Sequence, residues 1–279
     1  MSNIKRLNMV NRERETWQPP LFRASKTLSS QLIFALRRFF DLQTSSIWQD
    51  LAAELPDARG TVVDVGCGAQ PYRALLRGDV EYIGIDSADA ESHFGYSVPG
   101  TKYFEGPTWP LPDGSVDYVL CTETLEHVLD VPAFLNQAAR CLIPGGRILV
   151  TVPFSARWHY IPHDYWRFTP SSLSKLLNLA GFDDIAVYAR GNAITVASYK
   201  VIALILLLLM PQTKPPLAAL ALRLLSVPLL PLFLILAVIG QISLLGQGGD
   251  DCLGYTILAT RTGDPAKSEK HSAIAELRS

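Results

Sequence analysis

The chain has 279 residues, and its 25 Lys and Arg residues nearly balance its 26 Asp and Glu residues, which gives a formal net charge of −1. This length suffices for one α/β domain with additional segments or for two small domains, and a charge so close to zero argues against a protein that gathers nucleic acid. Only 18% of the residues are charged and the mean hydropathy is +0.18, so part of the chain is unusually apolar for a soluble enzyme.

Cysteine spacing and the composition of the first residues bear on the compartment. The four cysteines lie far apart and include no Cys-x-x-Cys pair, which argues against both a zinc site and a disulfide framework. Residues 1–26 are basic and contain no apolar core, so they predict a loosely ordered arm and not a secretory signal. The expected environment is therefore the reducing, cytoplasmic side of a membrane.

Residues 27–55 carry apolar side chains at helical spacing and predict two helices with a break near Thr44 and Ser45. Four short β-branched runs follow, separated by intervals long enough for helices: Thr61–Val65, Tyr82–Ile85, Val116–Cys121 and Arg147–Val152. Strands that alternate with helices pair in parallel, so the fold class is predicted to be α/β with a doubly wound sheet.

Further elements are predicted around the fourth run. Residues 131–142 predict a helix with Pro132 in its first turn, just before that run. The run is followed by an aromatic, histidine-containing segment, residues 153–169, and then by three more predicted elements: a helix over 171–180, a strand over 184–188 and a last strand over 253–261.

Residues 194–249 form the apolar part of the chain. Only Lys214 and Arg223 are charged between residues 201 and 249, and residues 224–245 are long enough to cross a hydrocarbon core of about 30 Å as a helix. Pro211, Pro215 and Pro216 predict a turn between two helices, while Pro228 and Pro231 predict kinks in the second helix.

The next strand has to rejoin the sheet, so both ends of this apolar segment must lie on one side of a membrane. We therefore predict a helical hairpin that crosses the bilayer twice or enters one leaflet. The alternative is an apolar helical pair that packs on the domain or forms a dimer.

The first two predicted strands end in residues suited to a nucleotide-like ligand. Gly66 and Gly68 follow the first strand, and glycines there let a ligand approach the backbone. Asp86 ends the second strand, where a carboxylate can accept two hydrogen bonds from a ribose diol. A tight turn and a helix N-cap are the alternative interpretations. Pro71 stands where a nicotinamide fingerprint needs glycine, and the sequence contains no Gly-Lys-Ser or Gly-Lys-Thr phosphate loop.

Five motifs in order resemble those of the class I S-adenosylmethionine-dependent methyltransferases, and are most similar to the bacterial type 11 subgroup that includes the ubiquinone and menaquinone methyltransferases. The motifs are Asp64–Gly68, Gly84–Asp86, Pro110–Val119, Leu125–Val128 and Leu142–Arg147. The resemblance covers residues 51–189 and resumes at 253–261.

The resemblance implies a Rossmann-like, seven-stranded sheet whose last strand is antiparallel. The methyltransferase domain would then comprise residues 27–193 and 250–262, with residues 194–249 as a hydrophobic helical hairpin inserted before the last strand. Residues 263–279 are expected to be a disordered tail because their composition is polar.

The resemblance also implies which residues contact the cofactor S-adenosylmethionine. In chain order they are Asp64, Gly66, Cys67 and Gly68 at its amino-acid part, Asp86 at the ribose hydroxyls, Ser87 beside the adenine, Glu105 and Gly106 near the adenine amino group, and Cys121 and Thr122 beside the methionine portion. The chain departs from the family at Gln70, where many members have a third glycine, and at Glu105, where Asp is commoner.

Methyl transfer from a sulfonium is an in-line displacement, in which alignment of the two reactants supplies about 7–11 kcal/mol of the barrier. A base that takes the proton of an alcohol or phenol acceptor adds about 10²- to 10⁴-fold. The candidate catalytic residues are His127, His159, His163 and Asp164, and the candidate substrate-binding residues are Tyr165, Trp166 and Arg167.

Two alternatives apply to these candidates. His127 could instead order the loop after the fourth strand, and the later segment could be a surface loop held by its aromatic rings. Glu126 and the three histidines could also bind a divalent ion, but no ligand spacing requires one, so no metal is predicted.

Residues 163–170, His-Asp-Tyr-Trp-Arg-Phe-Thr-Pro, resemble a segment of methyltransferases associated with bacterial surface-polysaccharide synthesis. With the hairpin, they favour O-methylation of a hydroxyl on a lipid-linked or envelope glycan at the cytoplasmic face of the bacterial inner membrane. The alternatives are methylation of a quinone or another lipophilic small molecule, a non-catalytic cofactor-binding membrane partner protein, and a purely cytoplasmic location. A small-molecule or lipid-linked substrate is expected, with no nucleic-acid partner.

Overall fold

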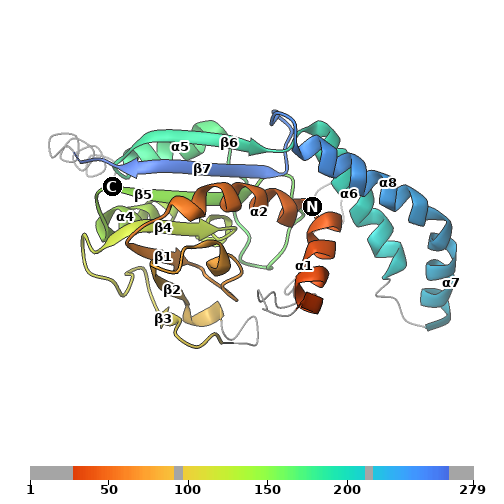
Figure 1. Cartoon of the computed structure of the whole chain (residues 1–279), viewed down its shortest axis with the longest axis horizontal. Helices are drawn as coiled ribbons and strands as arrows, with labels where there is room; N and C mark the ends of the chain where they lie inside the picture. Colours follow the sequence, from red (N-terminus) through yellow and green to blue (C-terminus); the bar gives the residue numbers. More distant parts are fainter. Residues whose placement is uncertain (1–27, 91–96, 211–215, 264–279) are drawn as a thin grey trace, which may run out of the picture.

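A mixed sheet of seven strands forms the centre of the main domain in the computed structural model, which describes residues 28–90, 97–210 and 216–263 (Figure 1). The strands are β1 (Thr61–Val65), β2 (Glu81–Ser87), β3 (Lys102–Phe104), β4 (Val116–Thr122), β5 (Leu142–Pro153), β6 (Phe182–Arg190) and β7 (Gly254–Arg261). Their order is β3-β2-β1-β4-β5-β7-β6, and β7 is antiparallel to both of its neighbours while the other pairs are parallel.

This topology confirms the predicted Rossmann-like sheet with an antiparallel last strand. The basic arm expected at 1–26 and all but the first residue of the tail expected at 263–279 lie outside the described residues.

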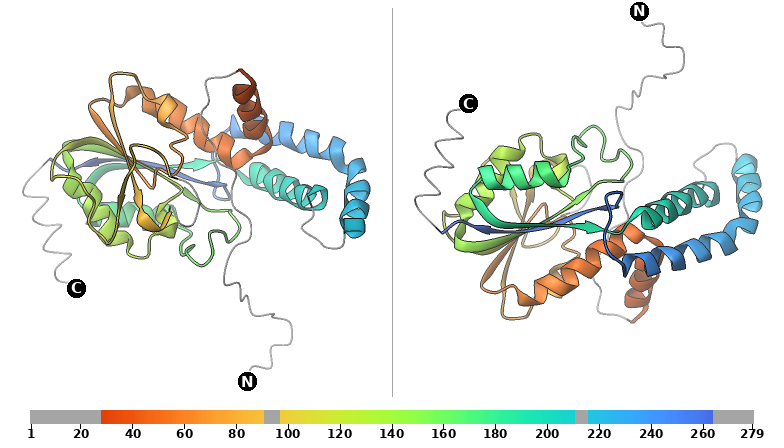
Figure 2. Two further views of the ribbon diagram at one scale, coloured as in Figure 1. Left: turned by 90° about the horizontal axis from the view of Figure 1, so that it is seen from below. Right: turned by 90° about the horizontal axis from the view of Figure 1, so that it is seen from above.

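Helices cover both faces of the sheet. Helix α2 (Leu42–Glu54) lies on one face, and α4 (Val131–Cys141) and α5 (Pro170–Leu179) lie on the other (Figure 2). Alternate residues of the central strands therefore enter two separate cores: Ile148 faces the core under α4 and α5, and Leu149 faces the core under α2. Burial on both faces explains why these strands are apolar runs without alternation.

The first two helices meet at Asp41, and not near Thr44 and Ser45 as the sequence predicted. Helix α1 covers Leu28–Phe40, and the Asp41 carboxylate caps α2 by accepting hydrogen bonds from the Thr44 amide (3.1 Å) and the Thr44 hydroxyl (2.8 Å). Thr44 and Ser45 have the composition of a turn, but Asp41 reaches the free amides of the first helical turn and so determines where the helix begins.

The connection from β1 to β2 contains a single 3₁₀ turn, η2 (Arg73–Leu75), where the strand and helix alternation predicted a helix. Gln70 adopts a left-handed conformation (φ 56°) and is followed by Pro71, which has no amide to donate. Both residues oppose a regular helix directly after the glycine loop. Two other 3₁₀ turns are η1 (Leu55–Asp57) and η3 (Leu125–His127).

A helical hairpin extends away from the sheet domain, as predicted (Figure 1). It consists of α6 (Ala193–Leu209), α7 (Pro216–Ser226), η4 (Val227–Leu229) and α8 (Leu230–Leu244). Of the two prolines predicted to kink the second helix, Pro228 lies in η4, between α7 and α8, whereas Pro231 lies in the first turn of α8, where a proline is accommodated. Gly254 pairs with both Pro153 and Arg190, so the hairpin leaves and re-enters the sheet at the carboxyl ends of β5 and β6.

The base of the hairpin is packed on the first two helices. Gly240 of α8 lies so close to Leu42 that a Cβ atom at this glycine would come within 2.4 Å of the leucine side chain. The Gln241 amide group donates to the carbonyls of Arg38 and Phe39, and its oxygen accepts from the Ser45 hydroxyl. The hairpin is therefore anchored at the α1–α2 junction.

The capping role of Asp41 predicts a measurable loss of stability in Asp41→Ala. Removal of a side chain that caps a helix N-terminus costs about 1 kcal/mol, so the free energy of unfolding measured in urea should fall by about that amount. Asp41→Ser keeps a capping oxygen and should retain most of the stability. Equal losses in both variants would contradict this assignment of the helix start.

Candidate functional site

The loops after β1, β2, β4 and β5 meet at one edge of the sheet, because these strands are parallel and their carboxyl ends lie together. Ligands of open α/β sheets bind at this edge. The four loops carry most of the site residues predicted from the sequence, and the hairpin leaves the sheet at the same edge.

The loop after β1 requires glycine. Gly66 and Gly68 both have left-handed backbone conformations, with φ of 69° and 48°. A Cβ atom at Gly66 would also lie 2.4 Å from the Thr124 side chain, which follows β4. The Gly66 amide donates to the Ile85 carbonyl at 2.9 Å. The loop is thus held between β2 and the β4 loop, with little room above its first glycine.

Asp86 is fixed against this loop. Its Oδ2 accepts a hydrogen bond from the Gly68 amide at 2.9 Å, and its Oδ1 accepts from the Ser87 amide at 2.8 Å. Burial raises the pKa of the carboxyl group, while the two amides oppose this rise. Each oxygen keeps a further lone pair, so a fixed Asp86 can still accept two hydrogen bonds from a ligand.

Asp64 lies one residue before the end of β1 and presents an unsatisfied acceptor. Its Oδ2 accepts from the Tyr82 hydroxyl at 2.7 Å, but its buried Oδ1 has no hydrogen-bond partner within the part of the chain that the structure describes. Burial raises the pKa of this carboxyl group to about 7. A ligand that donates a hydrogen bond or carries an ammonium group would satisfy this oxygen.

The remaining predicted cofactor residues differ in their exposure. Ser87, Glu105 and Gly106 are exposed at the neighbouring ends of β2 and β3, since Ser87 pairs with Phe104. Cys67 and Cys121 are buried, so their thiol groups are not exposed at this edge of the sheet. Thr122 is half-buried, and its carbonyl accepts a hydrogen bond from the Thr124 hydroxyl.

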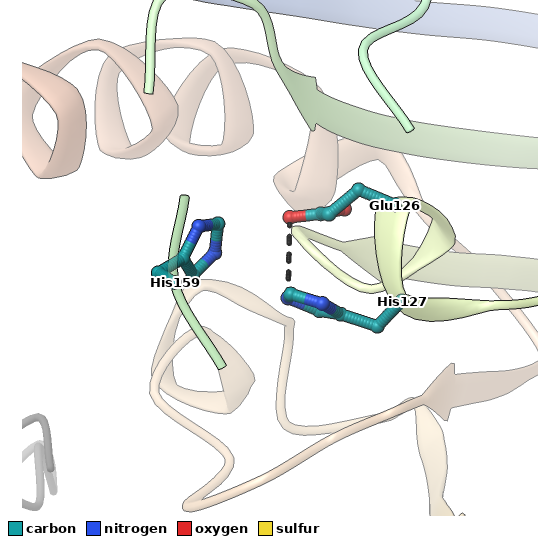
Figure 3. A group of neighbouring side chains, drawn as sticks. All are labelled: Glu126, His127 and His159. Atoms are coloured by element: carbon teal, nitrogen blue, oxygen red, sulfur yellow. Dashed lines mark ion pairs between the residues drawn. The ribbon is translucent and has the colours of Figure 1, made fainter. Parts of the chain in front are cut away.

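Glu126, His127 and His159 form a cluster at the same edge (Figure 3). The first two residues come from η3, and His159 comes from the segment after β5. Glu126 Oε1 lies 3.6 Å from His127 Nε2, and the ring centroids of the two histidines are 4.9 Å apart. Residues separated by more than 30 positions are thus brought into one group, which the sequence spacing alone did not predict.

Glu126 connects the two loops through its backbone and leaves its side chain unsatisfied. Its carbonyl accepts hydrogen bonds from the amides of Tyr165 (2.9 Å) and Trp166 (3.3 Å). Its carboxyl group is fully buried, and neither oxygen has a hydrogen-bond partner among the described residues. Burial, assisted by the nearby charge of Glu123, raises the pKa of this group well above its usual value.

The two histidines of the cluster have opposite electrostatic environments. His127 donates from Nδ1 to the His163 carbonyl at 2.8 Å, which leaves the Nε2 lone pair available. Burial lowers the pKa of His127 to about 4, so its ring is neutral at pH 7. Burial also disfavours the charged form of His159, but the Asp164 carboxylate 3.1 Å from its Nδ1 raises the pKa of His159 above its ordinary value.

Asp164 and Arg167 are engaged with each other. The two guanidinium nitrogens of Arg167 lie 2.6 and 2.8 Å from the carboxylate oxygens, and the His159 amide donates to the same carboxylate at 3.0 Å. Burial opposes the charged form of Asp164, but Arg167 and His159 keep its pKa below the usual range. This geometry favours a positioning role for both residues over the proton-accepting and substrate-binding roles expected from the sequence.

The other predicted residues form an exposed aromatic rim. Tyr165 and Trp166 are 41% and 42% exposed. The Tyr165 hydroxyl shares a hydrogen bond of 3.1 Å with the His163 ring, and the Trp166 indole donates to the Val128 carbonyl at 2.8 Å. The rings are therefore held in place beside the histidine cluster while their faces remain accessible.

One contact that organises the site had no signal in the sequence. Arg190, at the end of β6, is buried and pairs with Glu123 at 2.7 Å, directly after β4. The same guanidinium donates to the Val152 carbonyl, and Gln43 of α2 donates to the second Glu123 oxygen. These residues are far apart along the chain, so only the folded sheet brings them together.

The chain matches known proteins over its sheet domain. A family described as "Methyltransferase domain" matches residues 37–187. A probable S-adenosylmethionine-dependent methyltransferase of Mycolicibacterium smegmatis is 33% identical over 138 residues, which cover 44% of this chain and 51% of that protein. A demethylmenaquinone methyltransferase of Tropheryma whipplei is 32% identical over 133 residues, covering 45% and 54%.

A ubiquinone biosynthesis O-methyltransferase of Azorhizobium caulinodans is 28% identical over 149 residues, covering 44% of this chain and 58% of that protein. The chain spans about half the length of the curated relatives it matches. Among solved structures, a possible histamine N-methyltransferase of Thermotoga maritima has a TM-score of 0.49 and 17% identity, covering 83% of this chain and 97% of that one.

The buried, neutral His127 predicts an acid-sensitive fold in metal-free buffer. The unfolded chain takes up a proton near pH 6.5, whereas the folded chain does so only near pH 4, so stability falls as the pH drops through this window. The shift corresponds to about 3 kcal/mol. Urea unfolding at pH 7 and at pH 4 measures this loss. The free energy of unfolding of His127→Asn should fall by about 3 kcal/mol less between these two pH values than that of the unsubstituted chain. Parallel losses in the two proteins would contradict the assignment.

Proposed function

The chain belongs to the methyltransferase-domain family of class I S-adenosylmethionine-dependent enzymes, and from this premise we propose that it O-methylates a hydroxyl of a lipid-linked or envelope glycan at a membrane surface. The observation that carries this proposal is the arrangement at one sheet edge: a fixed ribose-type acceptor at Asp86, a neutral histidine at His127 and an exposed aromatic rim.

The residues of the carboxyl edge fit the cofactor. S-adenosylmethionine supplies a methyl group on a sulfonium, which departs as a neutral thioether. The free lone pairs of Asp86 suit the two ribose hydroxyls, and the unsatisfied Oδ1 of Asp64 suits the ammonium of the methionine part. Gly66 and Gly68 add no side chain of their own to the loop between these two acids, although the Thr124 side chain lies against Gly66. Ser87, Glu105 and Gly106 are the proposed contacts on the adenine side.

His127 is the proposed base for the acceptor hydroxyl. Its proton is on Nδ1, held by the His163 carbonyl, so Nε2 is free to accept a proton. Positioned bases of this kind contribute about 10²- to 10⁴-fold to a rate. Asp164 and Arg167 hold His159 beside the base. The aligned acceptor then attacks the methyl carbon in line with the departing sulfur, a step that depends mainly on positioning.

A glycan acceptor is favoured by the rim of Tyr165 and Trp166. Amphipathic rings with one apolar face suit the alternating polar and apolar surfaces of a sugar, and the nearby imidazoles supply hydrogen-bonding groups. The second candidate is a quinone ring, because two of the relatives are named for ubiquinone and menaquinone methylation. In both cases the acceptor would be attached to a lipid.

The distal part of the hairpin supports membrane contact. Leu217–Leu244 is 28 residues long and apolar enough to cross a membrane, and only 17% of its most apolar window is buried. The exposed apolar residues of the hairpin include Leu204, Leu207, Met210, Leu220, Leu224, Leu225, Leu234, Ile235 and Val238. Exposed leucines and isoleucine of α1 add to this surface. Because the hairpin leaves the sheet at the site edge, it would bring a membrane-anchored acceptor to the site.

Calorimetry with S-adenosylhomocysteine tests the cofactor site through Asp86→Ala. Hydrogen bonds to a charged group contribute about 1.5–3 kcal/mol each, so loss of both should weaken binding by at least about 10²-fold. Asp89→Ala removes a nearby exposed carboxylate and should bind as the unsubstituted chain does. No binding by the unsubstituted chain, or equal binding by Asp86→Ala, would defeat the methyltransferase proposal.

Transfer of a labelled methyl group into bacterial membrane extracts identifies the acceptor, with Asp86→Ala as the inactive reference. The proposal expects label in the glycan fraction and in an alkali-stable ether. Label confined to quinones would replace the glycan by the second candidate. Bound cofactor with no transfer to any fraction would support a non-catalytic role.

Flotation with phosphatidylethanolamine and phosphatidylglycerol vesicles tests the membrane contact. Leu225 is 74% exposed. Leu225→Glu places a charge on this surface, and because charge is costly in hydrocarbon, the fraction of protein bound to vesicles should fall by about tenfold or more. Tyr188→Glu changes an exposed residue of β6, outside the hairpin, and should float as before. Unchanged flotation of Leu225→Glu, or no flotation of the unsubstituted chain, would exclude this contact.

A further inference from the structure

We propose that Glu126, His127 and His159 bind a divalent transition-metal cation of the Zn²⁺ type beside the methyl-transfer site. The binding of the cation stands on the geometry of these three side chains alone. Its role in the reaction, described below, rests on the proposed function. The spacing of the three residues along the chain gives no metal-binding signature, so the proposal comes from the folded arrangement.

The three side chains converge from two elements (Figure 3). Each offers one ligand atom, and the three atoms lie within 4.8 Å of one another. A tetrahedral Zn²⁺ with bonds of about 2.1 Å holds its ligand atoms about 3.4 Å apart. The 3.6 Å between Glu126 Oε1 and His127 Nε2 is already close to this value. The third atom, on His159, lies within 4.8 Å of the other two and would have to approach them to complete the site.

Each imidazole is oriented as a metal ligand usually is. His127 donates from Nδ1 to the His163 carbonyl, and His159 Nδ1 faces the Arg157 carbonyl at 3.0 Å and the Asp164 carboxylate at 3.1 Å. In both rings Nε2 is therefore the nitrogen left for a ligand. A carbonyl or carboxylate on the outer nitrogen is the typical support of a metal-binding histidine, because it fixes the tautomer and the ring orientation.

The Glu126 carboxyl group supplies the second, independent observation. It is fully buried, and neither of its oxygens has a hydrogen-bond partner among residues 28–90, 97–210 and 216–263. A buried acid without partners costs free energy in either protonation state. The neighbouring guanidinium groups do not relieve it, because Arg167 is paired with Asp164 and Arg190 with Glu123. A cation between Glu126 and the two imidazoles would satisfy it.

The ligand set selects the class of metal. Two imidazoles and one carboxylate are the three protein ligands of several catalytic zinc sites, and they leave one position open for water or substrate. Mg²⁺ and Ca²⁺ prefer ligand sets made of oxygen and are disfavoured here. None of the four cysteines belongs to the cluster, and all four are buried free thiols.

On the proposed function, the open position would hold the acceptor oxygen. A cation there withdraws electron density from the hydroxyl, so that its proton leaves to water more readily. The oxygen lone pair then forms the bond to the methyl carbon, and the carbon–sulfur pair departs with the thioether. His127 would in this case orient the acceptor through the metal in place of receiving its proton.

The test is calorimetric titration of Zn²⁺ into the chelator-treated full chain, purified without a histidine tag. Visible spectra with Co²⁺ report a tetrahedral nitrogen and oxygen environment. We expect one cation per chain, and at least tenfold weaker binding in Glu126→Gln and in His159→Asn. His163→Asn removes the neighbouring imidazole that does not face the cluster and should bind as the unsubstituted chain does.

Absence of Zn²⁺ binding by the unsubstituted chain, or unchanged affinity in both Glu126→Gln and His159→Asn, would overturn the proposal. Near-ultraviolet circular dichroism shows whether each variant folds. If a variant does not fold, the number of Zn²⁺ ions bound per unsubstituted chain still decides the test. Binding of S-adenosylhomocysteine, measured in the same samples, separates the two proposals. Binding of Zn²⁺ without binding of S-adenosylhomocysteine would support the metal site and contradict the proposed function. Binding of S-adenosylhomocysteine without binding of Zn²⁺ would support the proposed function and contradict the metal site.

Discussion

The buried ion pair between Arg190 and Glu123 is the contact on which the carboxyl edge of this protein depends. It joins the end of β6 to the loop after β4, and the same two side chains also bind the end of β5 and helix α2. Loss of Glu123 would leave the buried Arg190 guanidinium uncompensated, and an uncompensated buried charge typically costs about 3–5 kcal/mol. The pair thus fixes the position of the segment that carries Glu126 and His127 relative to the start of the hairpin.

The site is assembled by a few backbone contacts between loops. The Glu126 carbonyl accepts hydrogen bonds from the amides of Tyr165 and Trp166, which connects the loop after β4 to the segment after β5. On the other side, Asp86 holds the Gly68 amide. The edge therefore has two parts: the acids at the ends of β1 and β2, which are the proposed nucleoside contacts, and the histidines and aromatic rings on the loops after β4 and β5. This division matches a reaction with two substrates, in which positioning supplies most of the rate.

The hairpin is an insertion that the sheet tolerates because of its topology. The antiparallel β7 returns along β5 and β6, so a segment between β6 and β7 can be long without disturbing any strand pairing. Its base is integrated into the fold by the close contact of Gly240 with Leu42 and by the Gln241 hydrogen bonds. Its distal helices keep large apolar side chains exposed, and this is the surface that the proposed membrane contact would cover.

The amino-acid sequence by itself determined the α/β class, the central strands, the glycine loop, Asp86 and the hairpin, because each depends on local pattern: β-branched runs, a glycine turn, a strand-ending acid and a long uncharged stretch. It did not determine the helix start at Asp41, since several residues there compete as caps, nor the single 3₁₀ turn between β1 and β2. Only the tertiary structure decided that the buried Glu126 carboxyl group has no hydrogen-bond partner among the described residues, that His159 lies beside His127 and that Asp164 is engaged with Arg167. These properties arise from the pairing of parallel strands, which places residues distant along the chain at a single edge and removes water from between them.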